Sequence, residues 1–197
     1  MSIEQNFKHQ HVVITGGSSG IGLCLAQDLA QRGARLTLVG RDADKLAQAA
    51  RQVQGPVQVA SVDVSDEQAV ADFFGQLGPL DHLVTAAAGT VRGNVVDLPV
   101  SQARALFESK YWGQYHCAKY AAAQLAARGS VVLFSGWISR KPMAGVSTLA
   151  AVDAAIEALG RTLALELAPR QRGDAWDDQH PALECTPGGG SAAGPLR

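Results

Sequence analysis

The glycine-rich stretch Thr15–Gly22 (TGGSSGIG) limits the possible folds of this chain more than any other feature. It follows the apolar run Val12–Ile14 and precedes a segment whose apolar residues recur at helical spacing, so the glycines lie at a strand-to-helix turn. Glycine allows tight bends and close backbone approach, and a helix N-terminus points free amide groups at whatever binds there. The stretch therefore predicts a phosphate-binding turn.

Apolar strands and helical segments alternate along the rest of the chain. Further strands are predicted at 35–39, 56–62, 80–86 and 131–135, and helices at 42–51, from about 66, at about 101–127 and at about 147–168. Such alternation with short connections is the pattern of a parallel sheet covered on both faces. We therefore predict one α/β domain over residues 1–169, with a Rossmann-like, doubly wound, three-layer fold. Residues 170–197 lack apolar periodicity and are expected to form an irregular tail, disordered or out of frame.

Charge and composition narrow the class of partner. The 197 residues carry a formal net charge of -1, which argues against nucleic acid or an anionic membrane surface as a partner. No apolar run approaches the length of a membrane span, and the first ten residues lack the apolar core of a signal peptide. Cys24, Cys117 and Cys185 are widely spaced, so we expect free thiols and no metal site. We expect a cytoplasmic protein that acts on a small molecule.

The pattern Thr-Gly-x-x-x-Gly-Ile-Gly resembles the cofactor motif of the short-chain dehydrogenase/reductase family, and the resemblance extends from about residue 8 to residue 169. It implies an oxidoreductase that binds a nicotinamide dinucleotide and acts on a carbonyl or alcohol. The residues that it implies for the pyrophosphate are Gly16, Ser18, Ser19, Gly20, Ile21 and Gly22.

The resemblance also implies residues for the rest of the cofactor. Arg41 follows the second strand, where this fold places the adenosine ribose, and an arginine there pairs with the 2'-phosphate of NADP. We therefore expect NADP(H) to be preferred over NAD(H). Asp63, followed by Val64, resembles the family's aspartate beside the adenine. The family's Asn-Asn-Ala-Gly segment is replaced here by small residues that still let the backbone pass close to the cofactor, and Ala87, Ala88 and Gly89 are the implied contacts.

The catalytic side chains of the family are absent from this chain. The family uses a Tyr as proton donor, a Lys four residues later, a Ser at the end of the fifth strand and an Asn on the preceding helix. Those Asn, Ser, Tyr and Lys positions hold Lys110, Gly136, Leu149 and Asp153, and Ser135 lies beside Gly136. A leucine cannot donate a proton and an aspartate cannot supply a positive charge, so the family's mechanism cannot operate in its usual form.

Three interpretations follow from these replacements. In the first, the chain is an oxidoreductase with a relocated acid, Lys110. The candidate hydroxyl partners are Ser135, Ser139, Tyr111 and Ser147. The alternative role for Lys110 is a structural ion pair with a neighbour such as Asp153, which is the commoner role for such lysines. In the second, the chain is a catalytically inactive scaffold or sensor that binds a nucleotide.

In the third, the chain is an incomplete copy of a family enzyme. In family members, a sixth strand and a Pro-Gly turn follow the segment that corresponds to the end of the resemblance, at about residue 169. Residues 170–197 of this chain do not show that pattern. Codons that encode Gln171–Cys185 can be chosen so that a reading frame one base later gives NVVMPGMTSTPLWN, which matches the absent segment. We therefore hypothesise that the chain is translated out of frame after about Pro169, and the gene sequence across these codons tests this.

Members of the family commonly form dimers or tetramers through two long helices. The corresponding segments here are about 101–127 and 147–168, and the first of them is rich in small residues that permit close helix packing. The resemblance therefore implies a homodimer or homotetramer.

Overall fold

The computed structural model describes residues 7–168, and the tail predicted for 170–197 lies outside this range. Five parallel strands form one sheet in the order β3-β2-β1-β4-β5. Their bounds are β1 His11–Thr15, β2 Arg35–Gly40, β3 Val57–Ser61, β4 Leu80–Thr85 and β5 Leu125–Leu133. Because β1 pairs with both β2 and β4, the strand order reverses beside it, which is where doubly wound sheets bind ligands. The predicted fold class is confirmed.

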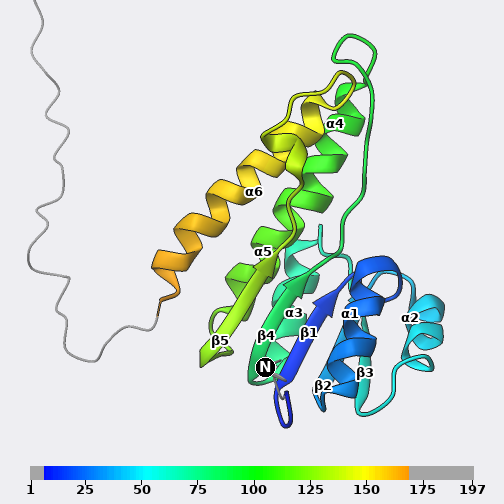
Figure 1. Ribbon diagram of the computed structural model, residues 1–197, viewed down its shortest axis with the longest axis vertical. Coiled ribbons are helices and arrows are strands. Elements are labelled where there is room, and N and C mark those ends of the chain that lie inside the picture. The colour runs from blue at the N-terminus through cyan, green and yellow to red at the C-terminus, as the bar shows by residue number, and fades with distance from the viewer. Residues whose placement is uncertain (1–6, 169–197) are drawn as a thin grey trace, which may run out of the picture.

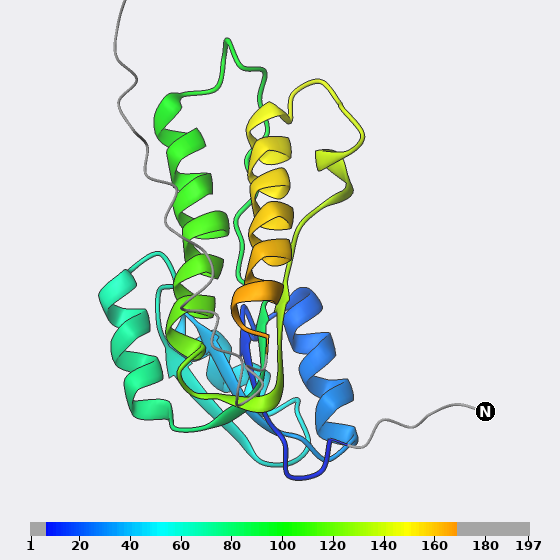
Figure 2. The same ribbon diagram turned by 90° about the vertical axis from the view of Figure 1, so that its left-hand side faces the viewer.

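Helices cover both faces of the sheet, as Figures 1 and 2 show. Their bounds are α1 Gly20–Gln31, α2 Ala43–Ala50, α3 Glu67–Leu77, α4 Val100–Leu106, α5 Gly113–Ala121 and α6 Ser147–Glu166, with a π-helical turn η1 at Phe107–Trp112 and a short 3-10 turn η2 at Trp137–Ser139. Alternate residues of β1 separate into two cores: Val12 and Ile14 pack against α1 and α2, whereas Val13 packs against α3 and α5. A third apolar cluster, around Leu106 and Ile156, joins α4 to α6 beyond the sheet.

The predicted helix ends were correct where capping residues mark them. Asp42 accepts a hydrogen bond from the backbone N of Lys45 at 3.0 Å and so caps α2, which lies within the helix predicted at 42–51. Asp66 caps α3 in the same way, through the backbone N of Ala69. Local chemistry is enough to define these two helix starts.

The prediction of one helix over about 101–127 was wrong at its C-terminal end. Helical structure stops at Ala121, and Leu125–Ala127 belong to β5, which begins well before the predicted 131. Alanine favours a helix, but Leu125 pairs with Leu80 and the backbone N of Leu80 donates to the carbonyl of Gln124 at 3.0 Å. A Cβ atom on Gly129 would lie 2.5 Å from the carbonyl oxygen of Asp81, so only glycine fits at the irregular point of this strand pair.

β5 forms one edge of the sheet among the described residues. A groove of about 510 Å³ separates β5 from α6 and is lined mainly by apolar residues, including Val131, Leu133, Ile156 and Leu163. An open strand edge beside an apolar groove is a template for pairing with another chain.

The described thiols are both free, as expected. Cys117 is buried against the sheet, and this burial raises the pKa of its thiol to about 12, whereas Cys24 lies exposed on α1. Among residues 7–168, no helix combines the length and the hydropathy that crossing a bilayer requires.

His11, at the start of β1, makes folding stability depend on pH. The residue is 2% exposed, and its ring lies between the carbonyl of Pro79, 3.0 Å from Nδ1, and the hydroxyl of Thr37, 2.8 Å from Nε2. Burial lowers the pKa of His11 below its ordinary 6.5, despite the hydrogen bond to Pro79. The unfolded chain therefore takes up this proton more readily than the folded one, and stability falls as the pH drops below 6.5.

We expect the free energy of unfolding to fall by up to about 1.4 kcal/mol per pH unit below that point, from the titration of this one group. Urea titrations at a series of pH values measure this slope. The variant His11→Gln should flatten it; an equal slope in this variant would show that other groups are responsible.

Candidate cofactor and active site

The glycine-rich turn between β1 and α1 packs directly on the backbone that follows β4. Gly16 has φ 71°, and a Cβ atom there would lie 2.6 Å from the backbone N of Ala87. A Cβ atom on Gly22 would overlap the carbonyl oxygen of Gly16. Both positions therefore require glycine, because neighbouring backbone atoms leave no room for a Cβ atom. Gly16 requires it also because its φ is positive.

The N-terminus of α1 is left open by its own sequence. Ser19, the N-cap residue, makes no capping hydrogen bond, and the first turn contains no acidic residue. The helices that follow β2 and β3 are instead capped by Asp42 and Asp66. The free amide groups and the helix dipole of α1 thus favour an anion at this turn, and Ile21 beside them is 65% exposed.

Arg41 and Asp63 lie together at the carboxyl ends of β2 and β3. Their side chains approach to 4.0 Å, and that of Arg41 is 76% exposed and able to reach a ligand. Burial opposes ionisation of Asp63, but hydrogen bonds from the hydroxyl and backbone N of Ser65, together with Arg41, outweigh it and hold its pKa below the ordinary value. Val64 is buried, and its side chain fills the space where a Cβ of Gly113 would stand.

The segment after β4 completes this edge of the sheet. The backbone N of Ala86 donates to the carbonyl of Thr15 at 3.0 Å, and that of Ala87 donates to the Thr15 hydroxyl at 3.3 Å. Ala88 and Gly89 are exposed. The structure therefore brings the predicted cofactor residues together at the carboxyl ends of β1 to β4, and their contact with a cofactor stays a prediction.

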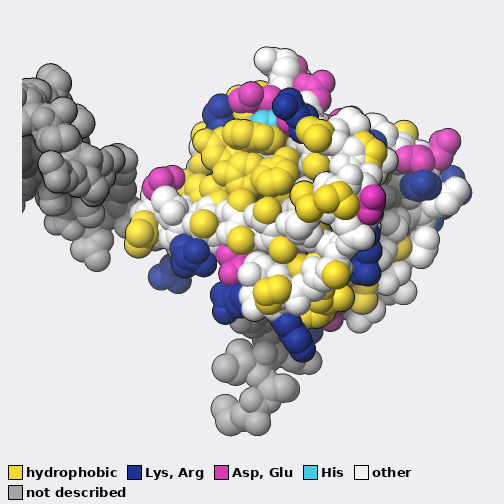
Figure 3. Space-filling model, turned by 90° about the horizontal axis from the view of Figure 1, so that it is seen from above, with side chains coloured by type: hydrophobic (Ala, Val, Ile, Leu, Met, Phe, Trp, Pro, Cys, Tyr) yellow, Lys and Arg dark blue, Asp and Glu magenta, His cyan; other side chains and the backbone are white. Residues whose placement is uncertain are grey.

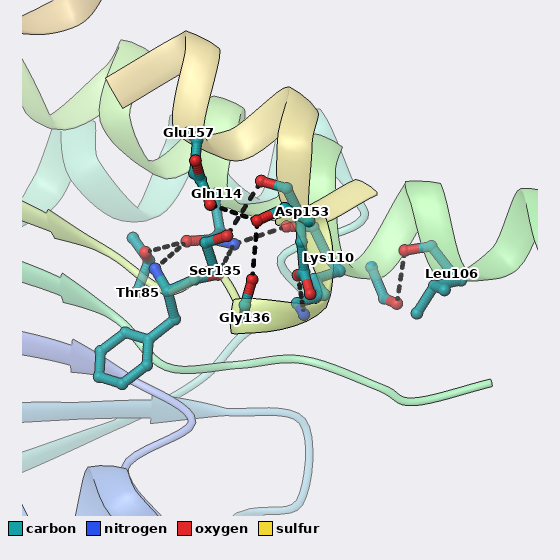
Figure 4. Close-up of polar contacts among 11 residues, drawn as sticks. Thr85, Leu106, Lys110, Gln114, Ser135, Gly136, Asp153 and Glu157 are labelled. Carbon is teal, nitrogen blue, oxygen red and sulfur yellow. Dashed lines mark hydrogen bonds and ion pairs between the residues drawn. The ribbon is translucent and has the colours of Figure 1, made fainter. Parts of the chain in front are cut away.

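Lys110 and Asp153 form a buried ion pair where the family has its Asn and Lys (Figure 4). Nζ of Lys110, on η1, lies 2.5 Å from Oδ1 of Asp153, on α6, and the two residues are 8% and 1% exposed. The predicted ion pair is confirmed. A Cβ atom on Gly136 would collide with Oδ2 of Asp153, so this carboxylate occupies the space that the family gives to its serine.

The other two predicted positions supply no free hydroxyl. Leu149 is 6% exposed and packs in the apolar cluster with Leu106 and Ile138. The hydroxyl of Ser135 donates to the backbone carbonyl of Asp153 at 3.0 Å. Ser135 thus fastens the segment after β5 to α6 with its single hydroxyl proton, whereas the ammonium group of Lys110 has three donors, one of which is directed at Asp153.

Two polar residues of this region were not predicted from the sequence. Gln114, on α5, is 1% exposed and bonds to Lys110 and to the ends of β4 and β5. Glu157, on α6, accepts hydrogen bonds from Ser139 and Arg140, which hold its pKa below the ordinary value. The sequence feature that could have indicated Gln114 is its position four residues after Lys110, which places the two residues on the same helix face.

The fold and the phosphate turn define a nucleotide-binding α/β protein, and comparison with known proteins assigns the family. The family model described as short chain dehydrogenase matches residues 10–171, and the chain belongs to this family. A 3-ketodihydrosphingosine reductase from Bos taurus is 34% identical over an alignment of 173 residues that covers 81% of this chain and 52% of that protein. An uncharacterized oxidoreductase from Staphylococcus epidermidis is 30% identical over an alignment of 170 residues that covers 82% of this chain and 73% of that protein.

Solved structures agree with this assignment. A small-chain dehydrogenase in complex with NADPH is 38% identical, with a TM-score of 0.67, and the match covers 81% of this chain and 66% of that one. A short chain dehydrogenase/reductase family protein has a TM-score of 0.76 at 32% identity, over 83% of this chain and 70% of that one. The chain spans about half the length of the bovine reductase that it matches.

Proposed function

We propose that this protein is an NADP(H)-binding oxidoreductase that acts on a carbonyl or alcohol in a small molecule. The observation that most directly supports this proposal is the glycine-rich turn at the uncapped start of α1, with Arg41 at the end of the neighbouring strand β2. The turn offers amides to a pyrophosphate, and Arg41 offers a guanidinium to a 2'-phosphate. The nicotinamide cofactor supplies the hydride when it is bound. The NADPH complex of a 38% identical dehydrogenase supports this choice of cofactor.

Lys110 is the residue to which we assign the proton. Its ammonium group carries hydrogens beyond the one directed at Asp153, and it lies at the carboxyl-end side of β4 and β5. A carbonyl oxygen placed beside Nζ would receive that proton as the carbon is reduced. Asp153 holds the ammonium group in place, and the buried apolar cluster around Leu149 keeps water from that side of the pair.

The bovine relative indicates which substrate to assay first. Its name, 3-ketodihydrosphingosine reductase, denotes a ketone on a long aliphatic chain. We propose a long-chain 3-ketone as the first member of a panel of carbonyl compounds, with oxidation of NADPH as the measurement.

Replacement of Arg41 tests the cofactor preference. We expect Arg41→Ala to weaken NADPH binding about tenfold or more and to leave NADH binding unchanged, because only NADPH carries the phosphate that the guanidinium pairs with. Fluorescence titration with each dinucleotide measures both constants. Arg51→Ala is the matched control, since Arg51 is an exposed arginine at the far end of α2. Equal losses for NADPH and NADH, or no binding of either by the unaltered protein, would contradict the proposal.

A second candidate function is nucleotide binding without turnover. It is favoured by the engagement of Lys110 with Asp153 and by the apolar Leu149 at the family's tyrosine position. Binding of NADPH with no oxidation across the carbonyl panel would support a scaffold or sensor and would exclude the reductase.

We also propose a homodimer or homotetramer formed through the long helices. The rings of Tyr111, Trp112, Tyr115 and His116 pack together along η1 and α5. Tyr111 stacks on Tyr115 and Trp112 stacks on His116, whereas Tyr111 and Trp112 meet edge to face with ring centroids 5.2 Å apart. Trp112 is 40% exposed. Figure 3 shows a broad hydrophobic patch on the end of the molecule where the helices project. A second copy would cover this patch, and sedimentation of the protein and of Trp112→Glu tests whether it does.

A further inference from the structure

Gln114 is a buried side chain whose hydrogen-bonding capacity is fully used. Its Oε1 accepts from the hydroxyl of Thr85 at 2.7 Å and from the backbone N of Phe134 at 2.7 Å. Its Nε2 donates to the carbonyl of Lys110 at 2.8 Å and to that of Phe134 at 3.0 Å. Two donors and two acceptors are therefore satisfied inside the protein, and the side chain has one orientation (Figure 4).

The contact with Phe134 extends strand β5. One amide group binds both the N–H and the C=O of Phe134, as a neighbouring strand would, and so fixes the chain just beyond Leu133. The next two residues are Ser135, which donates to the carbonyl of Asp153, and Gly136, which lies against the carboxylate of Asp153. Through Phe134, Gln114 therefore fixes the position of the segment that packs on Asp153, the acidic partner of the ion pair.

The contact with Lys110 acts on the basic partner. Lys110 lies in the π-helical turn η1, where the N–H of Gly113 reaches back five residues to the carbonyl of Glu108. Such turns displace backbone carbonyls from the regular pattern of bonds, and Gln114 provides the carbonyl of Lys110 with a side-chain donor. Gln114 thus contacts both supports of the pair without touching either charged group.

We propose that Gln114 is the positioning residue that keeps the Lys110 ammonium group in contact with the carboxylate of Asp153 and beside the carboxyl ends of β4 and β5. This inference rests on the proposed function for its catalytic consequence. Loss of the amide lets η1 and the segment after β5 move independently, so the pair opens more often and the proton on Nζ is misplaced.

The test compares the full chain with Gln114→Met, which keeps the side-chain length but removes all four bonds, and Gln114→Glu, which keeps the shape and removes the two donors. Thr37→Val is the matched control, because Thr37 is also buried and hydrogen-bonded, to His11, on the far side of β1. Acetylation of Lys110 by acetic anhydride, quantified by peptide mass spectrometry, reports opening of the pair whether or not the protein turns over substrate.

We expect Lys110 to be acetylated about fivefold faster or more in the Gln114 variants and at the original rate in Thr37→Val. We further expect kcat to fall about tenfold or more with the Kd for NADPH unchanged, because a small misplacement of a reacting group is costly. Unchanged acetylation in the folded variants, or an equal rise in Thr37→Val, would overturn the inference. Faster acetylation in a protein that reduces no carbonyl compound would leave this positioning role standing and would refute the reductase. Should Gln114→Met fail to fold, Gln114→Glu decides.

Discussion

Replacing Lys110 with methionine is expected to lower the free energy of unfolding by about 3–5 kcal/mol, the largest effect that we predict for a single side chain. Methionine has nearly the same length, so packing is largely kept. The substitution leaves Asp153, which is 1% exposed, without its partner cation. An ionised carboxylate in that position is either desolvated or must take up a proton, and both outcomes destabilise the folded state. Urea unfolding followed by circular dichroism measures the loss.

The double variant Lys110→Met with Asp153→Leu is the control for this prediction. With both charges gone, the apolar cluster around Ile138 and Val152 can close over the site, and we expect most of the stability to return. A double variant as unstable as the single one would mean that packing, and not the unpaired charge, determines the loss. NADPH binding should survive in the double variant, while turnover should not.

The second large effect is expected from Gly16→Ala. An alanine there must adopt φ near 71°, and its Cβ would lie 2.6 Å from the backbone of Ala87, which cannot move without displacing the end of β4. We expect a loss of about 2–5 kcal/mol in stability from strain and overpacking together. We also expect NADPH affinity to fall about tenfold or more, since the loss of about 1.4 kcal/mol of binding free energy through misplaced contacts weakens binding tenfold.

Gly75→Ala provides the comparison. Gly75 lies within helix α3, and a Cβ atom there meets nothing within 4 Å, so this change should stabilise the protein by up to about 1 kcal/mol. Thermal unfolding and NADPH titration of both variants separate the effect of the turn from that of removing a glycine. Tight NADPH binding by a folded Gly16→Ala protein would show that the turn does not hold the pyrophosphate.

The sheet and the glycine-rich turn could be predicted from the sequence, because buried parallel strands and glycine turns are local patterns. Val12–Ile14 is apolar throughout since both faces of β1 are covered, and Thr15–Gly22 carries its glycines where close approach demands them. Leu125–Ala127 was assigned to a helix because alanine favours one, and its pairing with Leu80 is a long-range contact that no local pattern reports.

The candidate site was predictable only in part for the same reason. The alignment of Lys110 and Asp153 with family positions placed them together and allowed their ion pair to be predicted. The role of Gln114 depends on partners 29 and 20 residues away in the chain, at Thr85 and Phe134, so its importance emerges only when the strand ends and the helix meet. The Gly136 contact with Asp153 is likewise tertiary.

The close fit of Lys110, Gly136 and Asp153 has an evolutionary consequence. Replacing Lys110 with the family's asparagine would leave the carboxylate without a cation, and replacing Asp153 with lysine would place two ammonium groups together. Replacing Gly136 with serine would drive a side chain into Oδ2 of Asp153. Each single step toward the ordinary family site therefore passes through a less stable protein, although the end point is a working arrangement elsewhere in the family. A lineage that acquired this trio would be held there by epistasis, and natural variation at these three positions should occur jointly or not at all.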